Sequence, residues 1–384
     1  MTVAIAGIGE LPHGKSVGQT AMERHEQLIK LALDDAGLKL SDVDAILTVA
    51  PRADSYLIHA TAVAEYLKIR PAIAFTLEAG GPGPMAMVEM ARGYIEGGSA
   101  KTVVIVAADM PLGGLTQNAY IHTLSEVGPV HPDLEVPFGP SVPSMFALVA
   151  RHHMYRYGLT QAQMGAVALQ GRRGAQLHPN AMMRKPLTME EYEQSPWIAA
   201  PLKRLDCAPV CDGGGAAVIT SLERAKDLPC KPVKVLGTGF SMGHMHLSAS
   251  PDLTDFNGGP SLDRALAAAK LDRSAIDVGL IYDCFTIAML INMEDLGLAP
   301  RGEAGRAFAS GAFAPGTKLP INPHGGLLSH GHPARGAGFG NLVEGVVQVR
   351  GEAGERQVPN AKIALAHGMG AVFATHGCLL LGAA

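Results

Sequence analysis

The chain has 384 residues, of which 47% are hydrophobic and 17% are charged, and its formal net charge at pH 7 is −4. This length and apolar content predict one large or two medium-sized domains with a substantial core. The mild negative charge and the absence of a Lys/Arg block argue against a nucleic-acid partner. No apolar stretch reaches the ~18 uninterrupted residues of a membrane span, so none is expected.

Apolar, strand-like runs alternate with helical patterns along the whole chain. Strands are predicted at 3–8, 45–50, 72–77, 102–107, 216–220, 233–237, 278–282, 363–367 and 372–381. Helices are predicted at 20–36, 84–97, 144–157, 261–269, 287–296 and 336–350. Residues 109–143, rich in Pro, Gly and His, are expected to form a long loop. The alternation indicates an α/β fold with buried sheets.

An internal repeat divides the chain. Residues 33–49 align without gaps with residues 266–282, with six identities. Each copy is interpreted as a helix end, a turn in which Ser41 or Ser274 caps the following segment, and a strand. The repeat predicts two duplicated α/β halves, 1–222 and 231–384, with a loop insertion at about 109–200 in the first.

A Gly-rich turn, T-L-E-A-G-G-P-G-P-M-A at 76–86, lies between a predicted strand and a predicted helix. Such turns offer backbone N–H groups and a helix dipole to an anion or a nucleophile. Here, however, no Ser, Cys or Lys lies between Gly80 and Met85. The turn therefore has the form of a reactive site without a side chain that can attack.

Several spaced motifs resemble the thiolase superfamily, in particular thiolases of the sterol-carrier-protein type. They are V-A-I-A-G-I-G-E-L-P-H-G at the N-terminus, D-C-A-P-V-C-D-G-G-G-A-A-V at 206–218 and I-Y-D-C-F-T at 281–286. L-P-I-N-P-H-G-G-L-L-S-H-G-H-P-A-R-G-A-G at 319–338 and H-G-M-G at 367–370 follow in the expected order. The resemblance implies the thiolase fold, in which two duplicated α/β halves form a five-layered αβαβα sandwich.

The resemblance also implies roles for the Gly-rich turn. In thiolases this turn carries the nucleophilic Cys, and its position falls here on Gly80, or on Ala79 after a one-residue slip. Neither residue forms an acyl-enzyme, which argues against the ordinary thioester exchange. Gly80, Gly81 and Gly83 are expected to bind substrate, because their backbone can still contact the thioester or leave room for an acyl chain.

The same resemblance points to four candidate catalytic residues. The Tyr-Asp-Cys-Phe motif resembles thiolase-fold aldolases, which implies that Tyr282 is an acid/base. His332 stands at the Gly-His-Pro position, and His330 stands where the aldolases have a second Tyr. His367 stands where classical thiolases have a second Cys that acts as base. Each has a structural alternative, such as a strand-end aromatic or a packing or strand-capping histidine.

Three further residues are expected to line the same cavity and bind substrate: Asn322, His324 and Gly370. The resemblance places four basic residues near the nucleotide part of coenzyme A, and exposed solvated cations are the alternative. These four are Arg172, Arg173, Arg184 and Lys185.

Three functions are considered. The first is an acyl-CoA enzyme that makes or breaks a C–C bond without an acyl-Cys, most concretely by aldol or retro-aldol chemistry on a β-hydroxyacyl-CoA. The second is a conventional acetyl-CoA acetyltransferase or 3-ketoacyl-CoA thiolase with a differently placed nucleophile. The third is a non-catalytic acyl-CoA-binding, lipid-binding or scaffold protein.

Partners and location follow from the same reasoning. An acyl-CoA thioester is expected as substrate, with no permanently bound cofactor and no metal. The resemblance implies a homodimer and a small zinc-ribbon/OB-fold partner that would be a separate chain. The five sparse cysteines and the absence of a signal-peptide pattern predict reduced thiols and a cytoplasmic location.

Overall fold

Nine strands form one mixed sheet in the computed structural model, which describes residues 2–54, 56–116 and 130–384. The strand order is β3-β2-β4-β7-β1-β8-β11-β10-β9. The strands are β1 (Val3–Glu10), β2 (Ala45–Thr48), β3 (Ile73–Thr76), β4 (Thr102–Asp109), β7 (Gly213–Ser221), β8 (Val233–Met242), β9 (Val278–Leu280), β10 (Ile363–Gly370) and β11 (Thr375–Ala383). Every predicted strand is present, with shifted ends. A short hairpin of β5 (Trp197–Ala199) and β6 (Leu202–Lys203) lies apart from this sheet.

The helices include all six predicted ones and several more. They are α1 (Ala21–Ala36), α2 (His59–Tyr66), α3 (Gly83–Glu96), α5 (Val142–Tyr157), α6 (Gln161–Gln176), α7 (Met189–Gln194), α8 (Leu222–Ala225), α9 (Gly259–Ala269), α10 (Thr286–Asp295), α11 (Ala304–Ala309), α12 (Gly326–His330) and α13 (Phe339–Arg350). The helix predicted at 336–350 starts later, because residues Ala334–Gly336 form a 3-10 turn.

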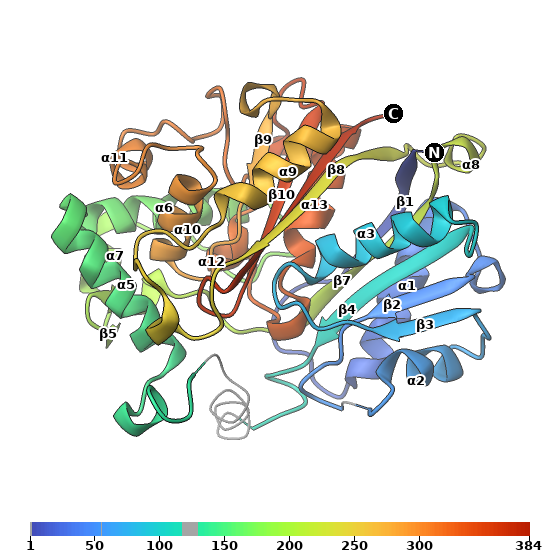
Figure 1. Cartoon of the computed structure of the whole chain (residues 1–384), viewed down its shortest axis with the longest axis horizontal. Coiled ribbons are helices and arrows are strands. Elements are labelled where there is room, and N and C mark those ends of the chain that lie inside the picture. Colours follow the sequence, from blue (N-terminus) through green and yellow to red (C-terminus); the bar gives the residue numbers. More distant parts are fainter. Residues whose placement is uncertain (1, 55, 117–129) are drawn as a thin grey trace.

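The sheet bends into two halves around a shared middle layer (Figure 1). The halves meet where β1 pairs antiparallel with β8, through Ala4 with Lys234 and Ile5 with Val233. One buried cluster contains residues of α3 and α13 together with residues of strands from both halves. A second cluster packs α1 and α2 on the outer face of the N-terminal half, and a third packs α9 and α10 on the C-terminal half. The layer order is therefore helix, sheet, helix, sheet, helix.

The two sequence repeats fold alike. In each, a long helix is followed by a 3-10 turn, Leu40–Asp42 or Arg273–Ala275, and then by β2 or β9. The predicted serine caps were wrong, because Ser41 and Ser274 lie inside these turns. In the second copy the carboxylate of Asp272 accepts from the Ser274 N–H instead. The predicted boundary between the halves stays a prediction.

The segment between β4 and β7 contains four helices and strands that the sequence did not predict: α6, α7, β5 and β6. Part of the expected loop at 109–143 lies outside the described residues, and residues Val136–Phe138 form a 3-10 turn. Helix α5 begins at Val142, before the predicted Ser144, because the Ser141 side chain accepts from the Ser144 N–H and caps it. Helix α6 packs on α10, α11 and α12 of the C-terminal half.

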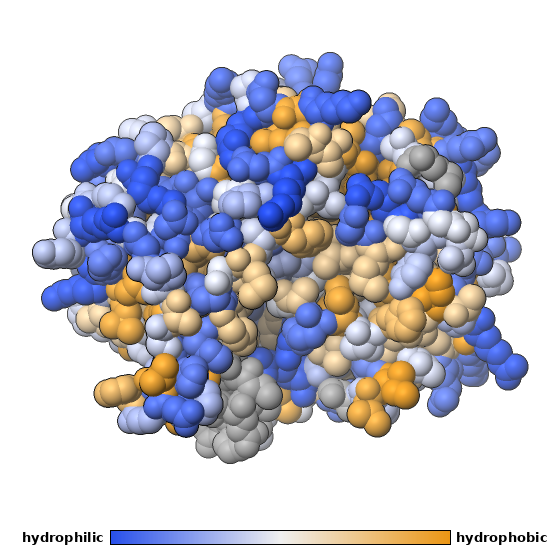
Figure 2. Space-filling model, viewed as in Figure 1, coloured by the Kyte–Doolittle hydropathy of each residue, from blue (hydrophilic) through white to orange (hydrophobic). Residues whose placement is uncertain are grey.

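The surface is mostly polar. On the face in Figure 2, blue polar and charged residues dominate the periphery, whereas hydrophobic residues gather across the middle. Within the described residues, the structure contains no helix long and apolar enough to cross a membrane.

Candidate active site

A cavity of about 700 Å³ opens beside the Gly-rich turn. Its apolar walls come from separate elements: Val142 and Phe146 of α5, Phe285 before α10, and Met369 of β10. Its polar side chains include those of Tyr282 and His332. Gly80, Gly81 and Gly370 also line it, as the sequence predicts. A cavity of this size accommodates a substantial apolar acyl group.

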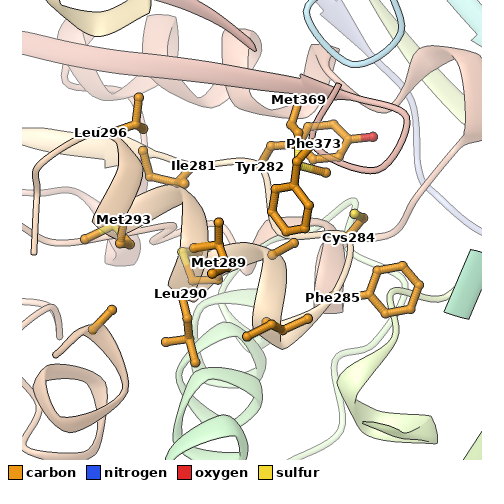
Figure 3. Packing of buried hydrophobic residues seen from close by; sticks show 14 of the residues in the cluster. Ile281, Tyr282, Cys284, Phe285, Met289, Leu290, Met293, Leu296, Met369 and Phe373 are labelled. Atoms are coloured by element: carbon orange, nitrogen blue, oxygen red, sulfur yellow. The ribbon is translucent and has the colours of Figure 1, made fainter. Parts of the chain in front are cut away.

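The hydroxyl oxygen of Tyr282 lies 2.9 Å from Nε2 of His332, and both residues line the cavity. Tyr282 follows β9 by two positions, and its side chain is buried. Figure 3 shows the Tyr282 ring beside Met369, with the hydroxyl directed away from the packed residues of α10. The structure therefore brings two of the four predicted catalytic residues into direct contact at the cavity wall.

The backbone around Tyr282 is held by buried amides. Asn322 bonds to Ile281 twice, accepting from its N–H at 2.7 Å and donating to its carbonyl at 2.8 Å. Asn292 donates to the Tyr282 carbonyl at 2.8 Å. The Tyr282 N–H donates to Nδ1 of His367 at 3.4 Å. These bonds fix the direction in which the phenol leaves the backbone.

His332 is held by the loop that precedes β7. Its N–H donates to the Pro209 carbonyl at 2.9 Å, and its carbonyl accepts from the Cys211 N–H at 3.2 Å. The preceding helix α12 is anchored at its start, where the Leu327 N–H donates to the Asp283 carboxyl at 2.6 Å. This hydrogen bond between Asp283, which follows Tyr282, and Leu327 of α12 connects the segment that carries Tyr282 to the segment that leads to His332.

The Gly-rich turn approaches Tyr282 too closely for a side chain. A Cβ on Gly81 would lie 2.2 Å from the Met369 carbonyl oxygen and 2.7 Å from Cε2 of Tyr282. Gly80 has φ of +66°, and a Cβ there would lie 2.8 Å from Cα of Gly370. Only glycine adopts this geometry readily. The end of β10 at Gly370 therefore occupies the space that a side chain at Gly80 would need, and the tyrosine ring occupies the space beside Gly81.

Burial sets the protonation of the cavity groups. Burial lowers the pKa of His332 to about 4, although a hydrogen bond to its own backbone opposes the shift. The imidazole is thus neutral at pH 7, and the nitrogen that faces Tyr282 is able to accept a proton. Burial also raises the pKa of the Cys207 thiol to about 12 and that of Cys284 well above its usual range. Both thiols line the cavity but stay protonated.

The other predicted site residues do not line this cavity. His367 lies behind Tyr282, with its Nε2 3.2 Å from Nδ1 of His376. Asn322 bonds to Ile281, and Gly83 begins α3. His330 and His324 are buried together elsewhere, with ring centroids 5.4 Å apart.

Among the basic residues expected near coenzyme A, Arg172 is buried, and its guanidinium contacts internal groups. It donates to Oγ of Ser329 at 3.2 Å and to the Lys185 carbonyl at 3.2 Å. This arginine supports α12 from within the protein.

Two arginines that line the cavity were missed by sequence reasoning. Arg335 lines the cavity and pairs with Glu78. It follows His332 within the recognised motif, so the signal was present. Arg52 also lines the cavity, and its backbone N–H donates to the Asp109 carboxylate at 3.1 Å. No local pattern after β2 marks Arg52, because its position depends on contacts 57 residues away.

The chain is similar to known proteins over most of its length. Residues 239–383 match the family model for the thiolase C-terminal domain. The acetyl-CoA acetyltransferase of Methanothermobacter thermautotrophicus is 29% identical, with 96% of each chain covered. The steroid side-chain-cleaving aldolase of Thermomonospora curvata is 32% identical, with 91% of this chain and 90% of the aldolase covered. The solved Ltp2-ChsH2(DUF35) aldolase superimposes with a TM-score of 0.86 and 31% identity, covering 100% of this chain and 98% of that one. The predicted thiolase fold is confirmed, and the chain belongs to the thiolase superfamily.

Proposed function

We propose that this chain is an acyl-CoA lyase that cleaves a β-hydroxyacyl-CoA by a retro-aldol reaction. The observation that carries the proposal is the 2.9 Å contact between the Tyr282 hydroxyl and Nε2 of His332 at the cavity wall. It supplies a proton relay beside a turn that lacks a nucleophile. The aldolase names of two relatives agree with it. A proton relay is what retro-aldol cleavage requires, and a covalent acyl-enzyme is not needed.

The proposed cleavage moves two protons and one electron pair. The Tyr282 oxygen takes the proton of the β-hydroxyl while the phenolic proton passes to Nε2 of His332. The Cα–Cβ bond breaks, the β-carbon becomes a carbonyl, and the bonding electron pair moves into the thioester enolate. The proton returns through Tyr282 to the α-carbon. The products are a shorter acyl-CoA and a ketone or aldehyde, and no free coenzyme A is consumed.

The enolate oxygen is placed against the backbone of the turn at Gly81, because the Gly80 N–H already donates to the Glu78 carboxylate at 3.2 Å. Both glycines line the cavity, and a Cβ on Gly81 would lie 2.7 Å from the tyrosine ring. Backbone N–H groups that face a developing oxyanion stabilise it without reorganisation. Glycine there serves two purposes, because it admits Tyr282 and leaves the backbone open to the thioester.

The apolar lining of the cavity is proposed to bind the departing carbonyl compound. Phe146 stacks on Phe285 with ring centroids 4.2 Å apart, and both line the cavity. Val142 and Met245 extend the same wall. We infer a bulky apolar leaving group, such as a ring system or a branched chain.

One relative supports a proposal about a partner chain. The Ltp2 aldolase was solved with ChsH2, a DUF35 protein. We propose that this chain also works with a separate zinc-ribbon/OB-fold chain and forms a homodimer. We also propose a cytoplasmic location, which the five free cysteines support.

Turnover of a panel of β-hydroxyacyl-CoA thioesters without free coenzyme A tests the proposal. The wild type should release a shorter acyl-CoA together with a ketone or aldehyde. Tyr282→Phe should reduce kcat about 10²–10⁴-fold, because the relay loses its hydroxyl. Cleavage that depends on free coenzyme A would instead establish a thiolase. Unchanged turnover in Tyr282→Phe would reject the assigned relay.

A further inference from the structure

A second group of buried polar side chains lies outside the cavity. We call it the His-Glu cluster: Glu10, His13, His178, His324 and His330. Its members come from β1, the loop after β1, the loop after α6, the segment before α12, and α12 itself. The exposed fractions of the four histidines are 8% or less. The cavity reaction uses none of these five residues.

The carboxylate of Glu10 lies between two imidazoles. Its Oε1 is 3.5 Å from Nε2 of His330, and its Oε2 is 3.7 Å from Nε2 of His178. The ligand atoms of these three residues all lie within 4.8 Å of one another. Ligands of a tetrahedral zinc ion, each about 2.1 Å from the metal, are roughly 3.4 Å apart. The spacing thus suits a shared ion better than direct hydrogen bonds.

Several ring nitrogens in the cluster have no hydrogen-bond partner among the described residues. They include both nitrogens of His330, His13 and His324. The rings are close, with centroids of His13 and His178 at 4.2 and 4.4 Å from that of His330. Buried polar groups are normally paired, so this many unsatisfied nitrogens around one carboxylate point to a missing ligand.

The Glu10 carboxylate is fixed from outside the cluster. The Asn180 side chain donates to Oε2 of Glu10 at 2.9 Å. Such an outer contact orients a metal-binding carboxylate. Glu344, whose carboxylate accepts from Arg356 at 3.1 Å, faces His178 at 3.9 Å from Nε2.

We propose that the His-Glu cluster binds one divalent transition-metal ion through Glu10, His178 and His330. The donor set of two imidazoles and a carboxylate suits Zn²⁺, Co²⁺ or Fe²⁺. The rings of His13 and His324 adjoin the site, with centroids 4.2 and 5.4 Å from that of His330. Sequence inspection misses the site because its residues are scattered from position 10 to position 330.

Coordination changes the hydrogen bonding of His178. Its Nδ1 now accepts from the Asn180 N–H at 3.1 Å, which leaves the ring proton on Nε2. Binding of the ion at Nε2 moves that proton to Nδ1, and the contact with the Asn180 N–H opens. The Asn180 side chain stays on Glu10.

The ion acts as a positioning element. His330 ends α12, and only Gly331 separates it from His332 of the cavity. A metal bond between Glu10 of β1 and His330 ties the first strand to the loop that carries His332. Metal binding is therefore expected to stabilise the fold.

The test begins with the full-length wild type treated with a chelator and then titrated with Zn²⁺ or Co²⁺. One equivalent should bind, as measured by elemental analysis after gel filtration, and the melting temperature should rise. X-ray absorption should show nitrogen and oxygen ligands with no sulfur. These three measurements use the wild type alone and do not depend on enzymatic activity.

Glu10→Gln and His178→Gln should each weaken Zn²⁺ affinity at least 10-fold and abolish the rise in melting temperature. His59→Gln is the matched control, because His59 is also fully buried with unpartnered ring nitrogens, and it should bind Zn²⁺ like the wild type. Failure of the wild type to bind a stoichiometric ion would overturn the proposal. So would sulfur ligation, or binding that both cluster variants retain.

Discussion

Gly81 and Tyr282 share one space: a Cβ at position 81 would lie 2.7 Å from Cε2 of the tyrosine ring. The same Cβ would also lie 2.2 Å from the Met369 carbonyl oxygen, so the backbone of β10 prevents a side chain at position 81 from moving away from the ring. A side chain at position 81, next to the predicted nucleophile position Gly80, is thus incompatible with this position of Tyr282. The glycine turn keeps the phenol against His332.

Gly81→Ala should therefore displace Tyr282. We expect kcat for β-hydroxyacyl-CoA cleavage to fall about 100-fold, since displacements near 1 Å in an active site have effects of this order. Gly93→Ala in α3 is the control, because a Cβ there meets nothing within 4 Å, and it should keep full turnover. Equal activity of Gly81→Ala and the wild type would mean that the tyrosine position does not matter.

A variant of His367 tests whether this residue positions Tyr282 or acts as the catalytic base. Its Nδ1 accepts from the Tyr282 N–H at 3.4 Å, and its Nε2 faces His376 at 3.2 Å. Burial, then the nearby His376, lowers its pKa well below the usual range, so it is neutral. We expect His367→Gln to lower kcat by less than about 10²-fold, whereas loss of a catalytic base costs about 10²–10⁴-fold.

The pH profile gives the second readout for His367. The shape of kcat/KM against pH should be the same in His367→Gln and the wild type, because the titrating pair is Tyr282 with His332. Disappearance of a limb from the profile would make His367 the base after all.

The sequence predicted the fold well because two kinds of signal agree. Buried strands such as β4 are continuous apolar runs, and the repeat at 33–49 and 266–282 indicated the two halves. The segment 109–200 was predicted poorly. Helix α6 carries Gly165, Gly171 and Gly174, which weaken a helical pattern but let α7 and the backbone around α12 approach closely.

The sequence predicted the candidate site only for residues that stand in a recognisable motif and also contact each other in the fold. Tyr282 and His332 stand in recognisable motifs, and the fold brings them together across 50 positions. His330 stands in the same motif as His332, yet its side chain points into the His-Glu cluster. The motif places both histidines close together in the chain, but tertiary packing decides which of the two side chains lines the cavity.

Cys207 tests the alternative that a displaced thiol is the nucleophile. The thiol lines the cavity, but burial and the neighbouring Asp206 raise its pKa to about 12. Because the thiolate is the reactive form, Cys207→Ala should keep turnover within about 2-fold of the wild type. Iodoacetamide at pH 7 should likewise leave the wild type active. Two results together would support a thiolase with Cys207 as its nucleophile. They are loss of turnover in Cys207→Ala and an acyl adduct at Cys207 in mass spectra of the wild type.

Acid should destabilise the protein through its buried histidines. Burial lowers the pKa of His25 and of His376 to about 4, and both side chains are buried. Their unfolded forms titrate near 6.5, so between these values the unfolded chain binds more protons and unfolding is favoured as pH falls. Each group contributes stability that is complete above about pH 6.5 and is lost down to about pH 4. From pH 6.5 to 5.5 each should cost about 1 kcal/mol.

Urea unfolding at pH 7.5, 6.5 and 5.5 measures this slope. His25→Leu is the informative variant, because it removes one titrating group from α1, together with a hydrogen bond to the Ala21 carbonyl at 2.7 Å and an edge contact with the His59 ring. Its unfolding free energy should fall by about 1 kcal/mol less than that of the wild type between pH 6.5 and 5.5. Parallel slopes in the two proteins would show that His25 already binds a proton in the folded state or stays neutral in the unfolded one. Because His25 does not line the cavity, the variant should also keep its turnover at pH 7.5.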